Sequence, residues 1–546
     1  MNSFEEIKNE LIKQNRIKFL KSKNDKVYLY DAFSQNLFPV TKSVNEFFES
    51  EKNTNIDNNE ILAICTKLSK WNNKEKECSR LPETHLIINF SNKCNLNCNY
   101  CYRHKNNQNV MSLERAFEVL EYANKYFKSN NDEIIFSLDM TAEALLDFEK
   151  IEKFDDKLAE YENLYIDDTD LISISASDFL NILKAELYTK NSISFSENVS
   201  NDLKQIIFDK KLFSHFSDKA KVDEILSIGN YDPEFLDKKR LLRLNRQLLE
   251  TFYPNFLKHK DYQQFRIWFM SNGTHITERE IELIKKVRIE PFWISLDGPE
   301  EVHNKNRKYY DNRGSYKDVI QNIKLLQDNK INVKISCVLT ADYPYPEKLY
   351  AYFKTLNVSE IQMCPIRNGN INSFTKDNVN ELLNGYKNLF NLFFEEIKNN
   401  DFSCFSLLKG DLSMLALINL FQRTKQNGRC TWGDEVVLDS KGDMYPCLYV
   451  IGQKKYLLGN IDEKKNSKEL LKPLAVTEMD KCETCWARYL CGGTCHYNSI
   501  ISRNSIYKVD ETECQIRKFV ITESISFLLS LIENKIDIQK ISRYFS

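Results

Sequence analysis

Alternating short apolar segments and amphipathic helices most restrict the fold of this 546-residue chain. Helical stretches such as SLERAFEVLEYANKYF and SYKDVIQNIKLLQDN separate segments that are predicted to be buried strands. The predicted strands are HLIINFS at 85–91, EIIFSL at 133–138, FRIWFM at 265–270, FWISLDG at 292–298, INVKISCVLT at 331–340 and SEIQMCPI at 359–366. Repeated βα units predict a parallel sheet or barrel, with its chemistry at the carboxyl ends of the strands.

The length of the chain exceeds that of one ordinary domain, so several domains are expected. Charged, predominantly helical sequence interrupts the βα rhythm and predicts an inserted lid or scaffold, with a dedicated substrate- or partner-binding role as the alternative. The predicted domains are a small module at 1–82, the βα region at 83–400 with its insertion at about 147–264, a cysteine-rich domain at 401–520 and a C-terminal helix at 521–546.

Composition excludes several classes of function. The chain has 76 Lys and Arg against 78 Asp and Glu, a net charge of −2, which argues against a general nucleic-acid binder. It has no run of about 18 apolar residues, so no membrane span is predicted. The opening MNSFEEIKNELIKQ lacks the apolar core of a signal peptide. We therefore expect a cytoplasmic protein without nucleic-acid or membrane partners.

Fifteen cysteines in such a protein are unsuited to a disulfide framework. Cys94, Cys98 and Cys101 have C-x3-C-x2-C spacing directly after the first predicted strand, and seven more lie between 430 and 514. Clusters at ligand-like spacing indicate metal or iron–sulfur sites. Zinc and cubane iron–sulfur sites use four ligands, so the first group leaves one position open. Zinc with a remote fourth ligand is the alternative.

The first cysteine group, with Tyr100 before its last cysteine, resembles the cluster loop of the radical S-adenosylmethionine (SAM) superfamily. The resemblance implies a [4Fe–4S] cluster on Cys94, Cys98 and Cys101, with SAM on the fourth iron and Tyr100 and Tyr102 at the cofactor site. It implies that SAM cleavage yields a 5′-deoxyadenosyl radical, which abstracts a hydrogen atom from the substrate. The implied fold is α/β: a partial (β/α)6 barrel with a helical insertion, a small winged-helix-like N-terminal domain and a C-terminal iron–sulfur domain.

Two later strand ends extend this resemblance. SNGT at 271–274 is similar to the TNG turn of the superfamily, and ISLDGPEEVHNKNR at 294–307 is similar to its S-L-D-G-P segment. The match implies that Ser295 lies near the SAM ribose and that Arg307 pairs with the SAM carboxylate. A guanidinium can bind a carboxylate through two hydrogen bonds. A surface salt bridge is the alternative for Arg307, and His303 is expected to be structural.

One stretch departs from the superfamily pattern. TAEALL at 141–146 stands where G-G-E-P-L-L is usual, and Glu143 aligns with the glutamate of that cofactor-binding motif. Thr141 and Ala142 permit fewer backbone conformations than glycine, so SAM geometry is expected to differ. This departure leaves a non-catalytic scaffold that binds a leader peptide as an alternative function.

The second cysteine group follows C-x11-G-x4-C…C-x2-C-x5-C-x3-C…C, which resembles the SPASM domain of peptide-modifying radical SAM enzymes. The resemblance implies two auxiliary [4Fe–4S] clusters, three in all, and a zinc ribbon is the alternative. The distal cluster is implied to use Cys482, Cys485, Cys491 and Cys514. The proximal cluster is implied to use Cys430, Cys447 and Cys495. Its fourth ligand is not evident, although distant Cys404 is a candidate; an open iron could instead take a substrate thiolate.

Two further features bear on the substrate. YLYDAF…LFPVTKSVNEFF in the N-terminal module resembles PqqD-like domains, which take a leader peptide as an added β-strand; a structural cap is the alternative. Cys364 lies near the end of the last predicted strand, where catalytic groups gather, so it is a candidate hydrogen donor to a substrate radical. A small buried hydrophobe is the alternative for this residue.

The resemblance therefore predicts a peptide maturase whose partners are a precursor peptide and a reductant such as flavodoxin or ferredoxin. A thioether crosslink is the leading product, and epimerisation and carbon–carbon crosslinking stay open. The rival is an anaerobic sulfatase maturase, which carries an aspartate directly after the second SPASM cysteine. Leu448 follows Cys447 in this chain, which argues against that rival.

Overall fold

The computed structural model describes most of the chain, including nearly all of its last 280 residues. The described ranges are 15–49, 84–101, 110–126, 133–138, 142–159, 264–287, 292–465 and 474–544, apart from short gaps at 23, 89, 91–92, 423, 429–431 and 433–434, with isolated positions 9, 11, 13, 63, 64 and 68. The helical prediction for the insertion falls outside these ranges from residue 160 onward.

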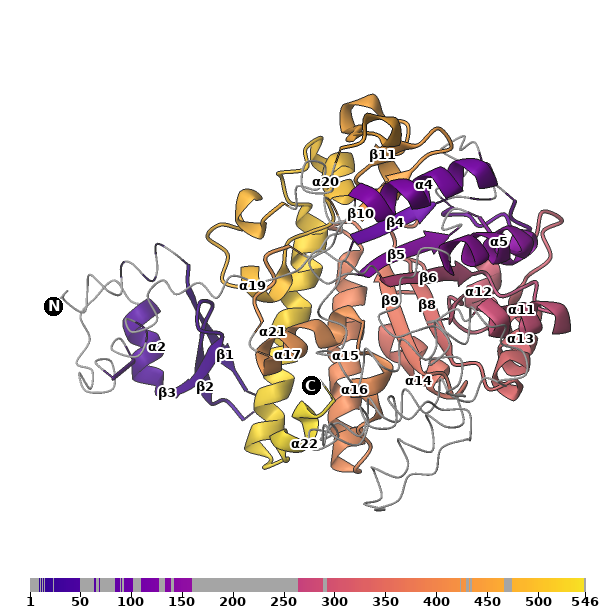
Figure 1. Cartoon of the computed structure of the whole chain (residues 1–546). Coiled ribbons are helices and arrows are strands. Elements are labelled where there is room, and N and C mark those ends of the chain that lie inside the picture. The colour runs from indigo at the N-terminus through magenta and orange to yellow at the C-terminus, as the bar shows by residue number, and fades with distance from the viewer. Residues whose placement is uncertain are drawn as a thin grey trace, which may run out of the picture.

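A nine-stranded sheet in the order β12-β11-β10-β4-β5-β6-β7-β8-β9 forms the centre of the molecule (Figure 1). All neighbours from β4 to β9 pair in parallel and follow the order of the chain. These six strands are β4 (Thr84–Ile88), β5 (Glu133–Leu138), β6 (Gln264–Ser271), β7 (Phe292–Ser295), β8 (Val333–Leu339) and β9 (Glu360–Pro365). The predicted parallel α/β sheet is thus confirmed, and the carboxyl ends of its strands meet at one edge.

Amphipathic helices connect and cover these strands, as Figure 1 shows. They are α4 (Leu113–Tyr126), α5 (Phe148–Ala159), α11 (Glu278–Val287), α12 (Glu300–Asn306), α13 (Tyr316–Asp328) and α14 (Pro346–Lys354). The predicted helices at 112–127 and 315–329 correspond to α4 and α13. In α4, buried Ala116, Val119, Leu120 and Ala123 recur at spacings of three and four residues, which turns one stripe toward the sheet.

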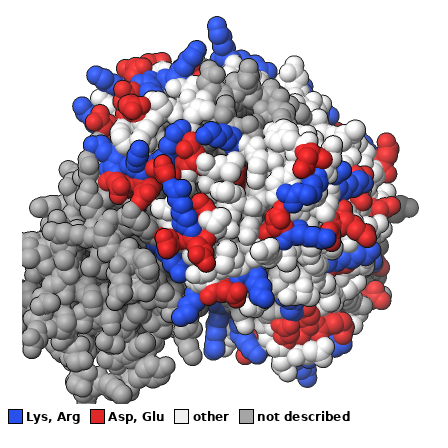
Figure 2. Space-filling model, turned by 90° about the vertical axis from the view of Figure 1, so that its right-hand side faces the viewer, with Lys and Arg blue, Asp and Glu red and all other residues white. Residues whose placement is uncertain are grey.

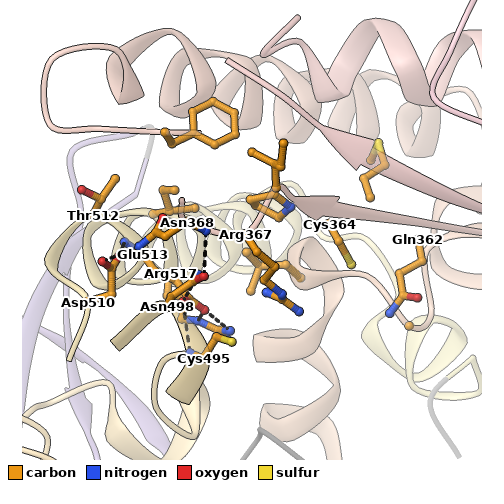
Figure 3. A pocket seen from close by; sticks show the side chains of 17 residues that line it. Gln362, Cys364, Arg367, Asn368, Cys495, Asn498, Asp510, Thr512, Glu513 and Arg517 are labelled. Carbon is orange, nitrogen blue, oxygen red and sulfur yellow. Dashed lines mark hydrogen bonds and ion pairs between the residues drawn. The ribbon is translucent and has the colours of Figure 1, made fainter. Parts of the chain in front are cut away.

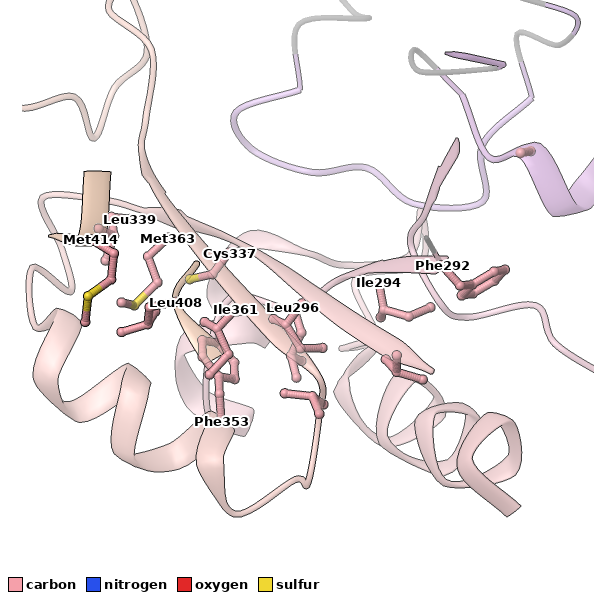
Figure 4. Close-up of a cluster of buried hydrophobic side chains, with 14 of the residues drawn as sticks. Phe292, Ile294, Leu296, Cys337, Leu339, Phe353, Ile361, Met363, Leu408 and Met414 are labelled. Carbon is pink, nitrogen blue, oxygen red and sulfur yellow. The ribbon is translucent and has the colours of Figure 1, made fainter. Parts of the chain in front are cut away.

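The core between strands and helices follows the period of two expected of β-strands (Figure 4). On β8, Val333, Ile335, Cys337 and Leu339 are buried and the residues between them are only partly so. They pack with β9 and with Phe353 of α14 in one cluster. Cys337 also donates to the Asp297 carbonyl at 3.6 Å, so it behaves as a small core residue.

Helix α5 changes one predicted boundary. Phe148, Ile151 and Phe154 of this helix are buried, and the Phe154 ring meets Phe90 of the strand end and Phe136 of β5 edge-on, at 5.3 and 5.2 Å. The helix therefore belongs to the βα core, and 147 is too early a start for the insertion. Charged residues on its outer face conceal the apolar stripe in the sequence.

The C-terminal region continues the central sheet. Strand β10 (Glu435–Leu438) pairs in parallel with β4, and β11 (Asp443–Tyr445) and β12 (Gly459–Asn460) extend it in antiparallel fashion. Gly442 in the β10–β11 turn has φ +82°, and a Cβ there would lie 2.6 Å from Arg115, which explains the glycine of the pattern.

Helices complete the C-terminal region. They are α15 (Val379–Lys398), α16 (Ser403–Leu407), α17 (Leu412–Gln422), α19 (Arg488–Cys491), α20 (His496–Arg503), α21 (Glu511–Glu533) and α22 (Ile538–Ser542). Helix α21 packs against both α15 and α17. The predicted boundary between 520 and 521 falls inside α21, so the C-terminal helix begins ten residues earlier and includes Cys514.

The N-terminal module is a separate antiparallel sheet of β1 (Ile17–Lys21), β2 (Val27–Asp31) and β3 (Asn36–Val40), followed by α2 (Lys42–Glu49). Buried Arg16 forms an ion pair with Asp31 through two hydrogen bonds of 2.5 and 3.0 Å. One face of the sheet packs with α2 in its own core, and the other lies beside α21 and α19 (Figure 1).

Two surface observations bear on partners. Within the described ranges, no helix has the length and apolar character needed to span a bilayer. Figure 2 shows Lys and Arg side chains interspersed with Asp and Glu over the face that lies at the right of Figure 1. This face therefore offers mixed charge, in keeping with the net charge of −2.

Buried His303 makes the stability of the barrel depend on pH. Its Nδ1 accepts from the Asp297 N–H at 3.3 Å, and its Nε2 donates to the Ser315 hydroxyl at 2.9 Å, since that hydroxyl itself donates to a carbonyl. Burial lowers the pKa of His303 from 6.5 to about 4. The unfolded chain then binds more protons between these values, so stability is lost as the pH falls through them.

We expect a change from about pH 7 to about pH 5 to cost about 2 kcal/mol of unfolding free energy through His303. Thermal unfolding across this range checks the effect, and His303→Gln is expected to flatten the dependence. His275→Gln is the matched control, because the His275 side chain is 44% exposed. Equal pH dependence in the two variants would contradict the assignment.

Candidate active site

The first cysteine group lies in the loop after β4. Burial and the neighbouring Cys94 and Cys101 raise the pKa of the Cys98 thiol to about 12, while the Arg307 guanidinium opposes the shift. The Cys101 N–H donates to the Cys98 carbonyl at 3.1 Å, and Asn272 donates to Cys94 Sγ at 3.8 Å. The structure thus brings the three predicted thiols together beside Arg307, which directly follows α12.

Backbone hydrogen bonds fix this loop against the segment after α12. The N–H groups of Asn97 and Asn99 donate to the carbonyls of Lys308 and Asn306 at 2.7 and 3.0 Å. Across the ranges described, no three His, Cys, Asp or Glu side chains converge as ligands of a single ion would. The cysteine loop is therefore fixed to the segment that carries Asn306 and Lys308.

Arg307, Asp297 and Tyr100 form a network at the carboxyl end of β7. Arg307 Nε donates to Asp297 Oδ2 at 3.1 Å, the Tyr100 hydroxyl donates to the same oxygen, and the guanidinium lies 5.4 Å from the centre of the Tyr100 ring. Arg307 is 8% exposed, so the pair is buried and the surface salt bridge considered from the sequence is wrong. Its terminal nitrogens hydrogen-bond no described residue, which leaves them for another anion.

Glu143 connects the cysteine loop with the SNGT turn. Its carboxylate accepts from the Asn272 N–H at 2.5 Å, the Ser271 hydroxyl at 2.8 Å and the Leu145 N–H at 3.2 Å. Its own N–H donates to the Lys93 carbonyl at 2.9 Å. Burial raises the pKa of Glu143 to about 7, although the hydrogen bonds oppose this. Its described contacts thus make Glu143 a positioning residue for both loops.

Backbone geometry explains why the glycine of the SNGT turn is kept. Gly273 in the SNGT turn has φ +73°, and a Cβ there would lie 2.9 Å from Ile294. Glu143 is extended, with φ −116° and ψ 105°, which any residue adopts. Ser295 ends β7 and is buried beside this turn region. Tyr102 and Thr141 lie outside the described residues.

Four of the later cysteines gather beneath the start of α21. Burial and the neighbouring Cys491, Cys485 and Cys514 raise the pKa of Cys482. Burial raises the pKa of Cys514 to about 11, and the Lys518 ammonium opposes the shift. The predicted distal set is therefore brought together from three segments that are separate in the sequence, beside the cations of Lys518 and Arg517.

The proximal set is described only in part, because Cys430 lies outside the described residues. Burial, and after it the proximity of Cys495, raise the pKa of Cys447, so these two thiols are neighbours. Cys404 instead lies in α16, wholly buried, and burial and the charges of Glu396 and Asp401 raise its pKa. Cys404 belongs to the helical core, and its suggested role as the missing proximal ligand is wrong.

A cavity of about 320 Å³ opens between the carboxyl end of β9 and the starts of α20 and α21 (Figure 3). Cys364 and Arg367 enter it from the strand end, and Cys495 enters it from the opposite side. Glu513 accepts from Arg517 at 2.8 and 2.5 Å and from the Cys495 N–H at 3.0 Å. The cavity therefore joins the candidate hydrogen donor Cys364 to Cys495 of the proximal set.

Sequence reasoning missed the charged residues of this cavity. Arg367, Glu513 and Arg517 become neighbours only when β9 meets α21, more than 140 residues later in the chain. The one local signal was the position of Arg367 directly after a predicted strand, where functional side chains gather in βα folds.

Comparisons with known proteins agree with this arrangement. No model of a known protein family matches the chain. It is 28% identical over 264 residues to the cysteine-type anaerobic sulfatase-maturating enzyme of Clostridium novyi, covering 45% of this chain and 68% of that protein. The radical SAM cyclopropyl synthase TigE of Paramaledivibacter caminithermalis is 24% identical over 390 residues, 70% of this chain and 62% of its own length. The chain is a radical SAM enzyme.

Solved structures show the same fold. The radical SAM enzyme described here superposes on anSMEcpe with bound AdoMet with a TM-score of 0.54 at 18% identity, over 85% of this chain and 98% of the other. The anSMEcpe complex with AdoMet and the Cp18Cys peptide gives 0.53 at 19% identity, over 83% and 99%. The similarities to the two curated enzymes count against the non-catalytic scaffold considered from the sequence.

Proposed function

We propose that this radical SAM enzyme modifies a residue of a ribosomally made precursor peptide, with a thioether crosslink as the leading product. The observation that carries the proposal is the cavity that Cys364 and Arg367 share with Cys495. A peptide residue in that cavity would lie between the end of β9 and Cys495. The structure of a relative with a bound peptide supports a peptide as the class of substrate.

The donor set of the first loop fits the implied cofactors. Cys94, Cys98 and Cys101 would hold a [4Fe–4S] cluster, and the terminal nitrogens of Arg307 would bind the SAM carboxylate. Bound together, cluster and SAM supply a 5′-deoxyadenosyl radical that abstracts a hydrogen atom. Tyr100 and Asp297 hold the guanidinium in place, and Glu143 holds the two loops together. Ser295 would lie near the ribose, and Tyr102 would complete the site.

The later cysteines would hold two auxiliary clusters. In a thioether reaction the substrate carbon loses a hydrogen atom, the substrate thiol loses its proton to solvent, and one electron must leave. An auxiliary cluster is a suitable electron acceptor, and flavodoxin or ferredoxin would supply reductant for SAM cleavage. Cys447 and Cys495, with Cys430, would leave one proximal iron open for the substrate thiolate. Cys364 would serve as the hydrogen donor if the product were an epimer.

The N-terminal module is proposed to bind the leader part of the precursor. Within the described residues, strand β3 pairs with β2 only, so its other edge offers N–H and carbonyl groups to an added strand. Edge addition gives affinity through main-chain hydrogen bonds and register through side-chain pockets. The three-stranded sheet followed by α2 supports the PqqD-like assignment.

Anaerobic reconstitution with iron, sulfide, SAM and dithionite tests the proposal. We expect 5′-deoxyadenosine, and a short cysteine-containing precursor peptide from the neighbouring reading frame to become two hydrogen atoms lighter. Mass spectrometry measures the product. A peptide whose mass is unchanged in ordinary water, but which gains one deuterium when the reaction runs in heavy water, would indicate epimerisation. Cys364→Ser would then prevent the gain of deuterium. No 5′-deoxyadenosine with or without peptide would overturn the proposal.

An anaerobic sulfatase maturase is the second candidate, favoured by the similarity to the Clostridium novyi enzyme. The same assay with a sulfatase-derived cysteine peptide distinguishes it, since formylglycine can be trapped by a hydrazide. Leu448, which stands where those enzymes have their presumed base, packs against the apolar cluster of Ile87, Val437 and Tyr445. A hydrocarbon side chain cannot accept a proton, so we rank this candidate second.

A further inference from the structure

The N-terminal sheet is docked on the distal cysteine group. Successive residues of a strand point to opposite faces, so Leu29 packs with α2 while Tyr28 and Tyr30 point the other way. One apolar cluster on that face contains Tyr28, Tyr30, Cys485, Trp486, Leu490 and Ile525. The Tyr28 hydroxyl donates to Glu533 at 3.0 Å, and Gln35 donates to the Thr424 carbonyl at 2.7 Å. The N-terminal module thus packs on the cysteine-rich region through a defined interface.

Tyr30 has an unpaired polar atom at this interface. Its side chain is wholly buried, and its ring meets Trp486 edge-on at 6.0 Å. Its hydroxyl has no hydrogen-bond partner in the part of the chain that the structure describes. Leaving a buried hydroxyl unpaired costs folding free energy, so such an atom calls for a partner.

The groups around the hydroxyl leave few acceptors. Asp31, Arg488 and Cys485 are the charged or ionisable side chains that act on Tyr30. The Asp31 carboxylate already accepts two hydrogen bonds from Arg16 and one from the Ser34 N–H. Arg488 is a donor only and uses Nη1 on the Cys485 carbonyl at 2.8 Å. The Cys485 thiol by itself accepts no hydrogen bond from the hydroxyl, so the acceptor that remains on this side is the sulfur of a cluster that Cys485 would hold.

We propose that the Tyr30 hydroxyl donates a hydrogen bond to the sulfur of the distal cluster at Cys485, so that the N-terminal module tunes its reduction potential. This proposal rests on the cluster assignment of the proposed function. Hydrogen bonds to cluster sulfurs stabilise the more negative, reduced state and raise the potential. Tyr30 of β2 pairs with Leu37 of β3. A leader peptide added to the other edge of β3 would therefore be separated from β2, and from Tyr30, by β3 alone.

The test compares Tyr30→Phe with Tyr28→Phe in the full chain, reconstituted anaerobically with iron and sulfide. We expect Tyr30→Phe to lower the reduction equilibrium constant of one auxiliary cluster about tenfold, a shift of 59 mV for a one-electron couple, in an electrochemical titration followed by electron paramagnetic resonance. Tyr28→Phe also removes a tyrosine hydroxyl from this interface, one bonded to Glu533, and is expected to leave every potential unchanged.

The outcomes distinguish the role of Tyr30 from the assignment of a cluster to the distal cysteines. An unchanged potential in Tyr30→Phe, with full iron content, would overturn the role of Tyr30 and leave the cluster assignment in place. Equal shifts in both variants would show a packing effect and also overturn it. Iron content that is unaffected by Cys485→Ala would instead remove the cluster assignment, and this proposal with it.

Discussion

Replacing Cys98 with alanine is expected to abolish 5′-deoxyadenosine formation and to lower the iron content from about twelve to about eight atoms per chain, since each cubane holds four irons. Cys98 is the central thiol of the first group, and burial with its two neighbours raises its pKa. The loss of one ligand removes the site at which SAM would bind. Iron analysis and chromatography of the nucleoside product measure the two effects.

Cys404→Ala is the matched control for this substitution. Cys404 is wholly buried and packs in the helical core, away from both cysteine groups. We expect the Cys404→Ala enzyme to keep its iron and its 5′-deoxyadenosine formation. Equal iron loss in the two variants would show that the structure assigns Cys404 wrongly, and full activity of Cys98→Ala would contradict the cluster site.

Local patterns in the sequence were sufficient to predict the six parallel strands and the cysteine groups. Strand β8 is an apolar segment in which buried and partly buried residues alternate. This period of two can be predicted from neighbouring residues alone. The C-x2-C spacing of Cys482 and Cys485 likewise places two thiols together within one turn of chain. Both features depend on neighbours in sequence, which is why they could be predicted.

Contacts between distant segments could not be predicted in this way. The parallel pairing of β10 with β4 joins residues about 350 positions apart, and no local signal distinguishes it from a free hairpin. The same limit concealed the cavity at Arg367 and the seat of Tyr30 on Trp486. In α5 the failure was different, because charged residues on its outer face outweighed its apolar stripe.

Arg307→Ala is expected to destabilise the fold by about 3–5 kcal/mol, because it leaves the carboxylate of Asp297 buried without its cation. Chemical denaturation under anaerobic conditions measures the loss. Arg313→Ala is the matched control: its ion pair with Asp318 is formed by a side chain that is 58% exposed. Exposed pairs contribute about 0–1 kcal/mol, so the control is expected to stay close to the unaltered enzyme.

Arg307→Lys separates the structural role of Arg307 from its proposed role toward SAM. Lysine keeps a cation beside Asp297 but cannot use one planar group for Asp297 and a second carboxylate together. We therefore expect a stable protein with SAM binding weakened about 10- to 100-fold, which corresponds to one lost hydrogen bond to a charged group. Anaerobic calorimetric titration with SAM measures the change. If the lysine variant bound SAM as tightly as the unaltered enzyme, Arg307 would serve Asp297 and Tyr100 alone, and the SAM carboxylate would need another cation.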